Sequence, residues 1–207
     1  MQLASYLAQQ RQDFVRAFRS AHYPVGIQDP SNLGRFISTS ATWRWDPSFG
    51  PQRAFIRTVE GQHKEYWTNV NENRYRDGFK QFLHAEYGVP SESIASNMHA
   101  DHMLNREFAQ RHGLHFVRMA LVPMEYNQGW GGKVEKMLTR AIARDNSCYR
   151  FDYFILMKVL NIMPPADKAD YSERRVTIAE HLAAETALTT SEVLEGMDGI
   201  FKLWDVL

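Results

Sequence analysis

The segment that most constrains the fold is the apolar run LHFVRMALVPM at residues 114–124. Alternate side chains of a strand point to opposite faces of its sheet, and here both faces are largely apolar. That pattern is typical of a strand buried on both sides. Residues 96–104 also fit an extended segment, and residues 133–143 (KVEKMLTRAIA) carry apolar side chains at helical spacing. Residues 96–143 therefore predict a strand, an irregular loop, a second strand and a helix.

Further elements are expected on both sides of this ββα unit. Before it, the sequence predicts a helix over residues 1–18, strands over 35–45 and 54–59, and a helix over 75–87 that Gly88 ends. After it, the sequence predicts helices over residues 149–163 and 177–188, and a last helix that begins at Thr189 with Glu192 in a capping box. We therefore expect an α+β fold over one domain, residues 1–207. In that domain the ββα unit is embedded in a mostly helical structure with a small N-terminal β region and a helical region over 144–207.

Composition and charge narrow the class of protein. Of the 207 residues, 44% are hydrophobic and 23% are charged, the proportions of a globular chain. No apolar run reaches the roughly 18 residues that span a bilayer, and the N-terminus lacks the pattern of a signal peptide. We expect a cytoplasmic protein, or one delivered into the cytoplasm of a target cell. Residues 166–207 hold nine acids and four bases, so the rest holds 20 bases and 15 acids, a balance compatible with phosphate binding.

Polar residues with catalytic potential occur at three points of the ββα unit. Asp101 and His102 end its first strand, Asn127 precedes its helix, and Glu135 follows eight residues later. A neutral imidazole can take a proton from water near neutral pH. A hard divalent cation held by few protein oxygens can relieve the charge on a phosphodiester. An Asn oxygen suits such a cation, and a Glu nearby can hold a coordinated water. These residues predict phosphodiester hydrolysis.

These motifs resemble those of a known family. Residues 127–135 (NQGWGGKVE) resemble the helix segment of the His-Me finger, or ββα-metal, endonucleases, and are closest to the branch of DNA/RNA non-specific nucleases. The pair Asp101-His102, 25 residues before Asn127, is closer to the Asp-His of HNH enzymes. The resemblance implies that His102 is the general base, that Asn127 is a metal ligand and that Glu135 anchors a metal-bound water. Asp101 is implied as a second metal ligand or as a residue that orients the loop.

The resemblance also implies supporting residues, a cofactor and partners. Asn105 is the candidate for the Asn that braces the histidine in the family. The family's Arg before the histidine is absent, and Arg106 or Arg118 would replace it. The implied cofactor is a divalent metal, Mg²⁺ first and Mn²⁺ as an alternative. The implied partner is DNA or RNA, as the substrate. No interaction with a membrane is implied. Many such nucleases are bacterial toxins or effectors, which would add an immunity or inhibitor protein, and a phage nuclease is equally permitted.

Other readings of the sequence remain open. Ser38-Thr39-Ser40 after an apolar strand, with Glu92 later, is similar to elements of ADP-ribosyltransferase toxins. A non-catalytic interaction module is a further alternative. A zinc site is a further possibility, because four histidines fall within 17 residues: His99, His102, His112 and His115. No Cys pair accompanies them. Arginines interleave with aromatic residues over residues 43–76, as in a nucleic-acid groove or as in an ordinary core. The single cysteine, Cys148, is expected in the core.

Overall fold

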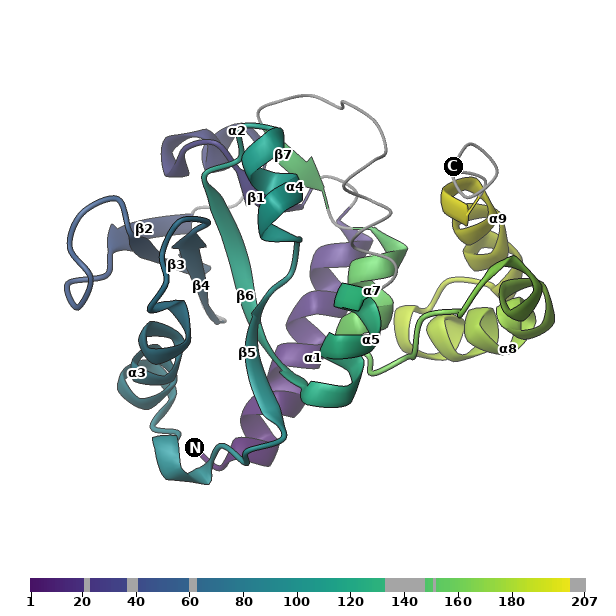
Figure 1. The fold of residues 1–207 in the computed structure, drawn as a ribbon, viewed down its shortest axis with the longest axis horizontal. Coiled ribbons are helices and arrows are strands. Elements are labelled where there is room, and N and C mark those ends of the chain that lie inside the picture. The colour runs from purple at the N-terminus through teal and green to yellow at the C-terminus, as the bar shows by residue number, and fades with distance from the viewer. Residues whose placement is uncertain (21–22, 37–40, 60–62, 133–147, 151, 202–207) are drawn as a thin grey trace.

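The computed structural model describes residues 1–20, 23–36, 41–59, 63–132, 148–150 and 152–201 (Figure 1). Its strands are β1 (Pro24–Ile27), β2 (Ala41–Trp45), β3 (Ala54–Val59), β4 (Lys64–Asn69), β5 (Met98–His102), β6 (Phe116–Pro123) and β7 (Cys148–Arg150). Its helices are α1 (Leu3–Arg19), α2 (Leu33–Phe36), α3 (Tyr75–Tyr87), α4 (Arg106–Arg111), α5 (Met124–Gly132), α7 (Tyr153–Val159), α8 (Lys168–Thr186) and α9 (Thr190–Phe201), with 3₁₀ turns η1 (Pro30–Asn32) and η2 (Ser91–Ser93). The α+β class expected from the sequence is confirmed.

The described strands form one antiparallel sheet that is organised around β6. The order is β2-β3-β4-β6-β1-β7, and β5 pairs with the remaining part of β6. The first residues of β6 lie between β4 and β1, where Val117 pairs with both Thr68 and Gly26. The later residues pair with β5, where Met119 is opposite His102. All residues of β6 except Pro123 are buried. The prediction of a strand buried on both sides is therefore confirmed.

The domain is mostly helical, as expected, with about 52% helix and 21% strand, but the N-terminal strands do not form a small region of their own. Strands β1 to β4 belong to the same sheet as β5 and β6. The physical reason is that β6 is long enough to change neighbours along its length, so both of its edges bind other strands. The predicted strand over 35–45 is shorter, because residues 33–36 form α2 and the strand β2 begins at Ala41.

Helix α1 packs against β6 through a buried amide. The Nε2 atom of Gln10 donates to the Leu121 carbonyl oxygen at 2.9 Å, and the Leu121 N–H donates to Gln10 Oε1 at 2.8 Å. Tyr6, Phe14 and Ala17 of the same helix are buried. Figure 1 shows α1 running along the ribbon of β5 and β6. The first helix of the chain is thereby fixed to the central strand.

The C-terminal helices have a core of their own. Figure 1 shows α8 and α9 beside the sheet, beyond α5 and α7. Trp130 of α5 packs into this core with Leu156 of α7, Leu182 of α8 and Met197 of α9. No helix among the described residues is long and apolar enough to cross a membrane. Helix α5, which carries Asn127, contacts the C-terminal helices through this core and also contacts β5 and β6 of the sheet.

Several element boundaries follow from caps. Gly88 ends α3 with φ of +62°, and the side chains of Thr189 and Glu192 form the predicted capping box, so both predictions are confirmed. The helix predicted over 149–163 begins only at Tyr153, because residues 148–150 pair with β1 and Asp152 caps the helix. The helix predicted over 177–188 begins earlier, at Lys168, because Asp167 caps it there.

Candidate functional site

The two strands of the predicted ββα unit are present, and the helix that follows them in the described residues starts earlier than expected. Strand β5 pairs with β6, and α5 starts at Met124, directly after β6 ends. A short helix, α4, occupies the connection that the sequence predicted to be irregular. Asn127 therefore lies inside α5 instead of ahead of a helix that starts at residue 133. The predicted helix over 133–143, with Glu135, lies outside the described residues.

The alternation of β5 separates the predicted site residues. His99 and Asp101 point to one face of the strand, and Ala100 and His102 to the other. The burial pattern agrees, because Ala100 and His102 are buried whereas His99 and Asp101 are half-buried. Helix α5 meets the first of these faces: Asn127 Nδ2 lies 3.3 Å from His99 Nδ1. The imidazole in contact with Asn127 is that of His99, which the sequence raised only as a zinc ligand.

Asp101 is held by a buried lysine. The Nζ atom of Lys158 lies 2.5 Å from Asp101 Oδ2, and Nζ also donates to the carbonyl oxygen of His102 at 3.4 Å. The Lys158 side chain is only 2% exposed, and that of Asp101 is 18% exposed. The sequence analysis missed Lys158. The available signal was a single charged residue inside the apolar run FILMKVL, since a buried lysine needs a partner.

His102 occupies an enclosed position on the opposite face of β5. Its Nε2 atom lies 2.9 Å from Thr68 Oγ1, and its ring centroid lies 4.4 Å from that of Tyr75. Burial lowers the pKa of His102 to about 3. Asp101 opposes this shift, and the positive charges of Arg106, Lys158 and Arg76 add to it. His102 is therefore neutral at pH 7, and water has little access to a side chain that is 3% exposed.

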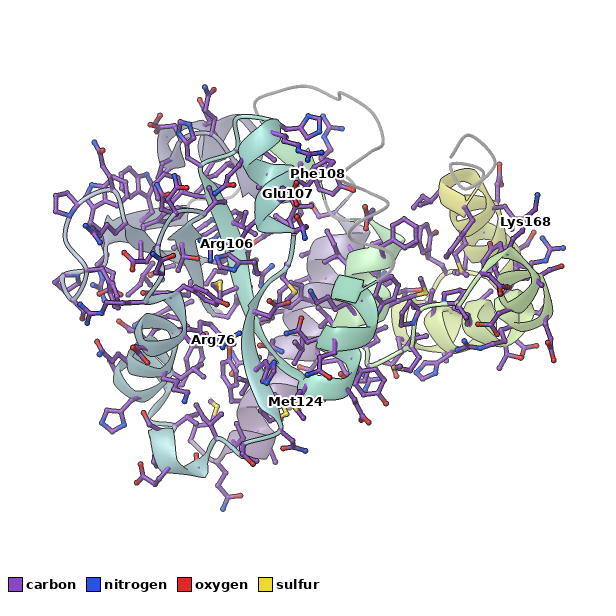
Figure 2. All side chains as sticks on the ribbon, in the orientation of Figure 1. Arg76, Arg106, Glu107, Phe108, Met124 and Lys168 are labelled. Atoms are coloured by element: carbon purple, nitrogen blue, oxygen red, sulfur yellow. The ribbon has the colours of Figure 1, made fainter. Side chains whose placement is uncertain are left out.

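Basic side chains lie near His102. Arg76 on α3 and Arg106 on α4 are labelled in Figure 2. Each guanidinium lies 5.5 Å from the centroid of the Tyr75 ring, and Arg106 Nε also donates to the Val70 carbonyl oxygen at 2.6 Å. Arg106, one of the two candidates to replace the family's Arg, therefore contacts the same Tyr75 ring as His102.

The two remaining predicted residues contribute to the scaffold through the contacts they make. Asn105 Oδ1 accepts from the N–H of Phe108 at 3.0 Å and caps α4. Arg118 is buried, lies 3.3 Å from Glu65 Oε1 and stacks 3.9 Å from the Phe14 ring centroid. Arg118 therefore belongs to a buried ion cluster between α1 and the sheet.

In the described part of the chain, the side chains that could bind a metal ion are spread apart. Within it, no three His, Cys, Asp or Glu side chains lie close enough to hold a metal ion. The four histidines considered for zinc are all described, and they do not form such a group. Asp101 and Asn127, two oxygen donors, come from the adjoining elements β5 and α5.

The other sequence features have mixed outcomes. Residues 38–40, the Ser-Thr-Ser element, lie outside the described residues, and Glu92 is exposed in η2. Among the aromatic residues that could line a groove, Trp67 and Tyr66 are buried in the core, and Trp43 is 39% exposed. Cys148 is buried, as expected.

Comparisons with known proteins were made for the whole chain. No protein-family model, no curated protein and no solved structure matches it. A function for this site therefore has to rest on the chemistry of the chain's own residues.

Proposed function

We propose that the chain is an endonuclease that hydrolyses phosphodiester bonds of DNA or RNA at the face of β5 that meets α5. The observation that carries the proposal is the contact between Asn127 and His99, two residues 28 positions apart. It places an amide and an imidazole next to each other on the face of β5 that also carries the carboxylate of Asp101. An imidazole can serve as general base and the two oxygen donors as metal ligands in metal-assisted hydrolysis of a phosphodiester.

In this proposal His99 takes the proton of the attacking water. Its Nδ1 atom faces the amide nitrogen of Asn127, so Nδ1 is the nitrogen with the free electron pair in the arrangement described. A separation of 3.3 Å is long for a hydrogen bond, and a water can replace the amide there. The half-buried His99 is reachable by such a water. His102, the base predicted from the sequence, is the alternative, and the variants below distinguish the two.

A divalent cation fits the oxygen donors at this face better than it fits any cluster of histidines. Mg²⁺ is commonly held by one or two protein oxygens and keeps several waters. Asp101 has two carboxylate oxygens, and Lys158 binds Oδ2. Hydrogen bonds from neighbouring residues commonly hold a metal-ligating carboxylate in this way. The amide oxygen of Asn127 is the second donor. When bound, the cation would relieve the negative charge on the phosphoryl oxygens.

The test is cleavage of plasmid DNA and of RNA with Mg²⁺, with Mn²⁺ and with EDTA. We expect metal-dependent cleavage, and we expect His99→Ala and Asn127→Ala to lower its rate by about 10²-fold or more. His181→Ala, at an exposed position on α8, is the matched control and should leave the rate unchanged. Loss in His102→Ala with full activity in His99→Ala would return the role of base to His102. No cleavage with any metal or substrate would refute the proposed function.

A further inference from the structure

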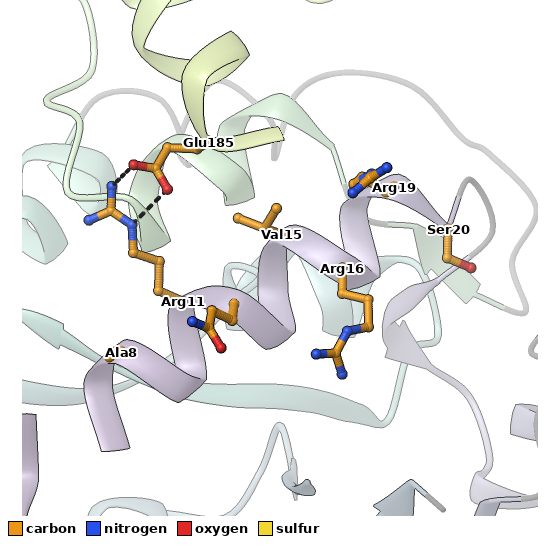
Figure 3. Close-up of a pocket in the computed structure, with 8 residues that line it drawn as sticks. Ala8, Arg11, Val15, Arg16, Arg19, Ser20 and Glu185 are labelled. Atoms are coloured by element: carbon orange, nitrogen blue, oxygen red, sulfur yellow. Dashed lines mark hydrogen bonds and ion pairs between the residues drawn. The ribbon is translucent and has the colours of Figure 1, made fainter. Parts of the chain in front are cut away.

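A basic groove runs along the side of α1 that faces away from the sheet. It has a volume of about 660 Å³ and lies between α1 and the end of α8. Figure 3 shows its lining, with Arg11, Arg16 and Arg19 on α1 and Glu185 on α8. A volume of this size is in the range of ligand pockets, about 300 to 1,000 Å³. The groove is separate from the face of β5 described above.

The charge in the groove is mainly positive. Arg11 and Glu185 form a two-point ion pair, with Nη2–Oε1 at 2.6 Å and Nε–Oε2 at 3.2 Å. This pair neutralises one arginine and holds it in place. Arg16, whose side chain is 53% exposed, lies 3.7 Å from the buried Asp13 carboxylate on the same helix, and the exposed Arg19 extends the positive charge toward the end of α1. Among the lining residues that the structure describes, Glu185 is the one acid.

The helix dipole alone does not explain this arrangement. Basic residues in the last turn of a helix favourably oppose the negative end of its dipole, which accounts for Arg16 and Arg19 as part of α1. It does not account for Arg11, which lies further back along the helix and contributes to the same groove. Gln12 and Ser20 add hydrogen-bonding groups between and beyond the arginines. A planar guanidinium can bind two oxygens of a phosphate at once, whereas the ammonium of lysine acts as a point charge.

We propose that this groove binds the sugar–phosphate backbone of a single nucleic-acid strand. The lined part of α1, from Ala8 to Ser20, is about 18 Å long at 1.5 Å per residue. For a strand with stacked bases, at 3.4 Å per nucleotide along its axis, that length corresponds to roughly five phosphates. The inference rests on the proposed function, because it assigns the groove to the same class of polymer as the proposed substrate.

The groove is fixed relative to the candidate site. Gln10, between groove residues Ala8 and Arg11, binds the backbone of Leu121 of β6 through both its amide nitrogen and its amide oxygen. Leu121 in turn pairs with Ala100 of β5, the residue between His99 and Asp101. A strand held by α1 is therefore held at a set position relative to β5. The groove contributes affinity and alignment, and the face of β5 contributes the chemistry.

The experiment is binding of a fluorescent 12-nucleotide single strand, measured by anisotropy in EDTA so that no cleavage occurs. We expect Arg16→Glu/Arg19→Glu to weaken binding about tenfold and to reduce the slope of log K against log salt by about 1.4. Arg111→Glu/Lys168→Glu carries the same change in charge outside the groove and is the matched control (Lys168 is labelled in Figure 2). Arg16→Gln/Arg19→Gln, a milder change, should give a smaller loss in the same direction and guards against a folding defect in the first variant.

Each outcome bears on the inference. Loss of binding in the groove variants alone supports it. Equal loss in the control, no loss in either, or no binding by the unmodified chain overturns it. Tighter binding of polyglutamate than of the oligonucleotide, lost in the same variants, also overturns it and indicates an acidic protein partner. Binding at the groove without cleavage by the chain refutes only the proposed function, and cleavage with unchanged binding in the variants refutes only the groove.

Discussion

Among single residues, His102 is held in surroundings that favour only its neutral form. Thr68 supplies a hydrogen bond, the Tyr75 ring covers the imidazole, and the side chain is 3% exposed. A base with a pKa far below working pH holds a proton poorly, so this histidine is better suited to support β5 than to catalyse a reaction. The sequence showed an Asp-His pair. The alternation of a strand, applied to residues 99–102, would already have placed His102 on the face opposite Asp101.

A measurable pH dependence of stability follows from His102. Its folded pKa of about 3 lies below the value of about 6.5 in an unfolded chain, so the unfolded state binds the proton first as the pH falls. This contribution to the free energy of unfolding is complete above pH 6.5. It is lost between pH 6.5 and 3, at up to about 1.4 kcal/mol per pH unit. Urea unfolding at pH 7 and pH 5 should show a larger loss for the natural chain than for His102→Gln. Equal losses would contradict the assignment.

For the helices and strands, prediction from sequence succeeded where a local signal fixed the boundary. The glycine after α3 and the capping box before α9 are such signals, since both act within one helical turn. It failed at β7 and α4. The apolar run that starts at Tyr149 has no local feature that separates strand from helix, and its pairing with β1 decides the outcome. For α4, the sequence analysis considered Asn105 for a functional role and did not foresee that it caps a helix.

The end of α3 provides a test of a local signal. Gly88 has φ of +62°, and a Cβ added there would lie 3.2 Å from the backbone nitrogen of Met1. We expect Gly88→Ala to lower the free energy of unfolding by about 1 to 2 kcal/mol, because an L side chain is strained in this conformation. Gly34→Ala is the matched control, because nothing lies within 4 Å of its added Cβ. Chemical denaturation measures both, and equal effects would show that the backbone conformation of Gly88 does not matter.

At the scale of the whole molecule, α1 and the sheet share a buried ion cluster around Glu65. Arg57 Nη1 lies 2.9 Å from Glu65 Oε2, Arg118 lies 3.3 Å from Oε1, and His63 bridges toward Asp13 of α1. Burial alone would raise the pKa of Glu65, but Arg118 and Arg57 outweigh it and hold that pKa well below its usual range. No periodicity of the sequence predicts this cluster, because its members come from separate strands and are brought together only by the sheet.

Removing the carboxylate of Glu65 should destabilise the whole fold. In Glu65→Gln, the guanidinium groups of Arg57 and Arg118 would remain buried without a matching negative charge. We expect the free energy of unfolding to fall by about 3 to 5 kcal/mol. Glu107→Gln breaks an exposed pair with Arg111 and should cost less than about 1 kcal/mol. Similar midpoints of chemical denaturation for the two variants would show that the buried cluster is not a main source of stability.

The double hydrogen bond of Gln10 also determines when the molecule can be completed during synthesis. The side-chain amide of Gln10 occupies the place of a neighbouring strand, and its partner Leu121 follows 111 residues later. At translation speeds of 5 to 20 residues per second, that partner is made roughly 6 to 22 s after Gln10. During this interval the apolar side of α1 has no β6 to cover it. The nascent N-terminal segment is therefore a candidate substrate for chaperones, which a folding assay on stalled ribosomes would detect.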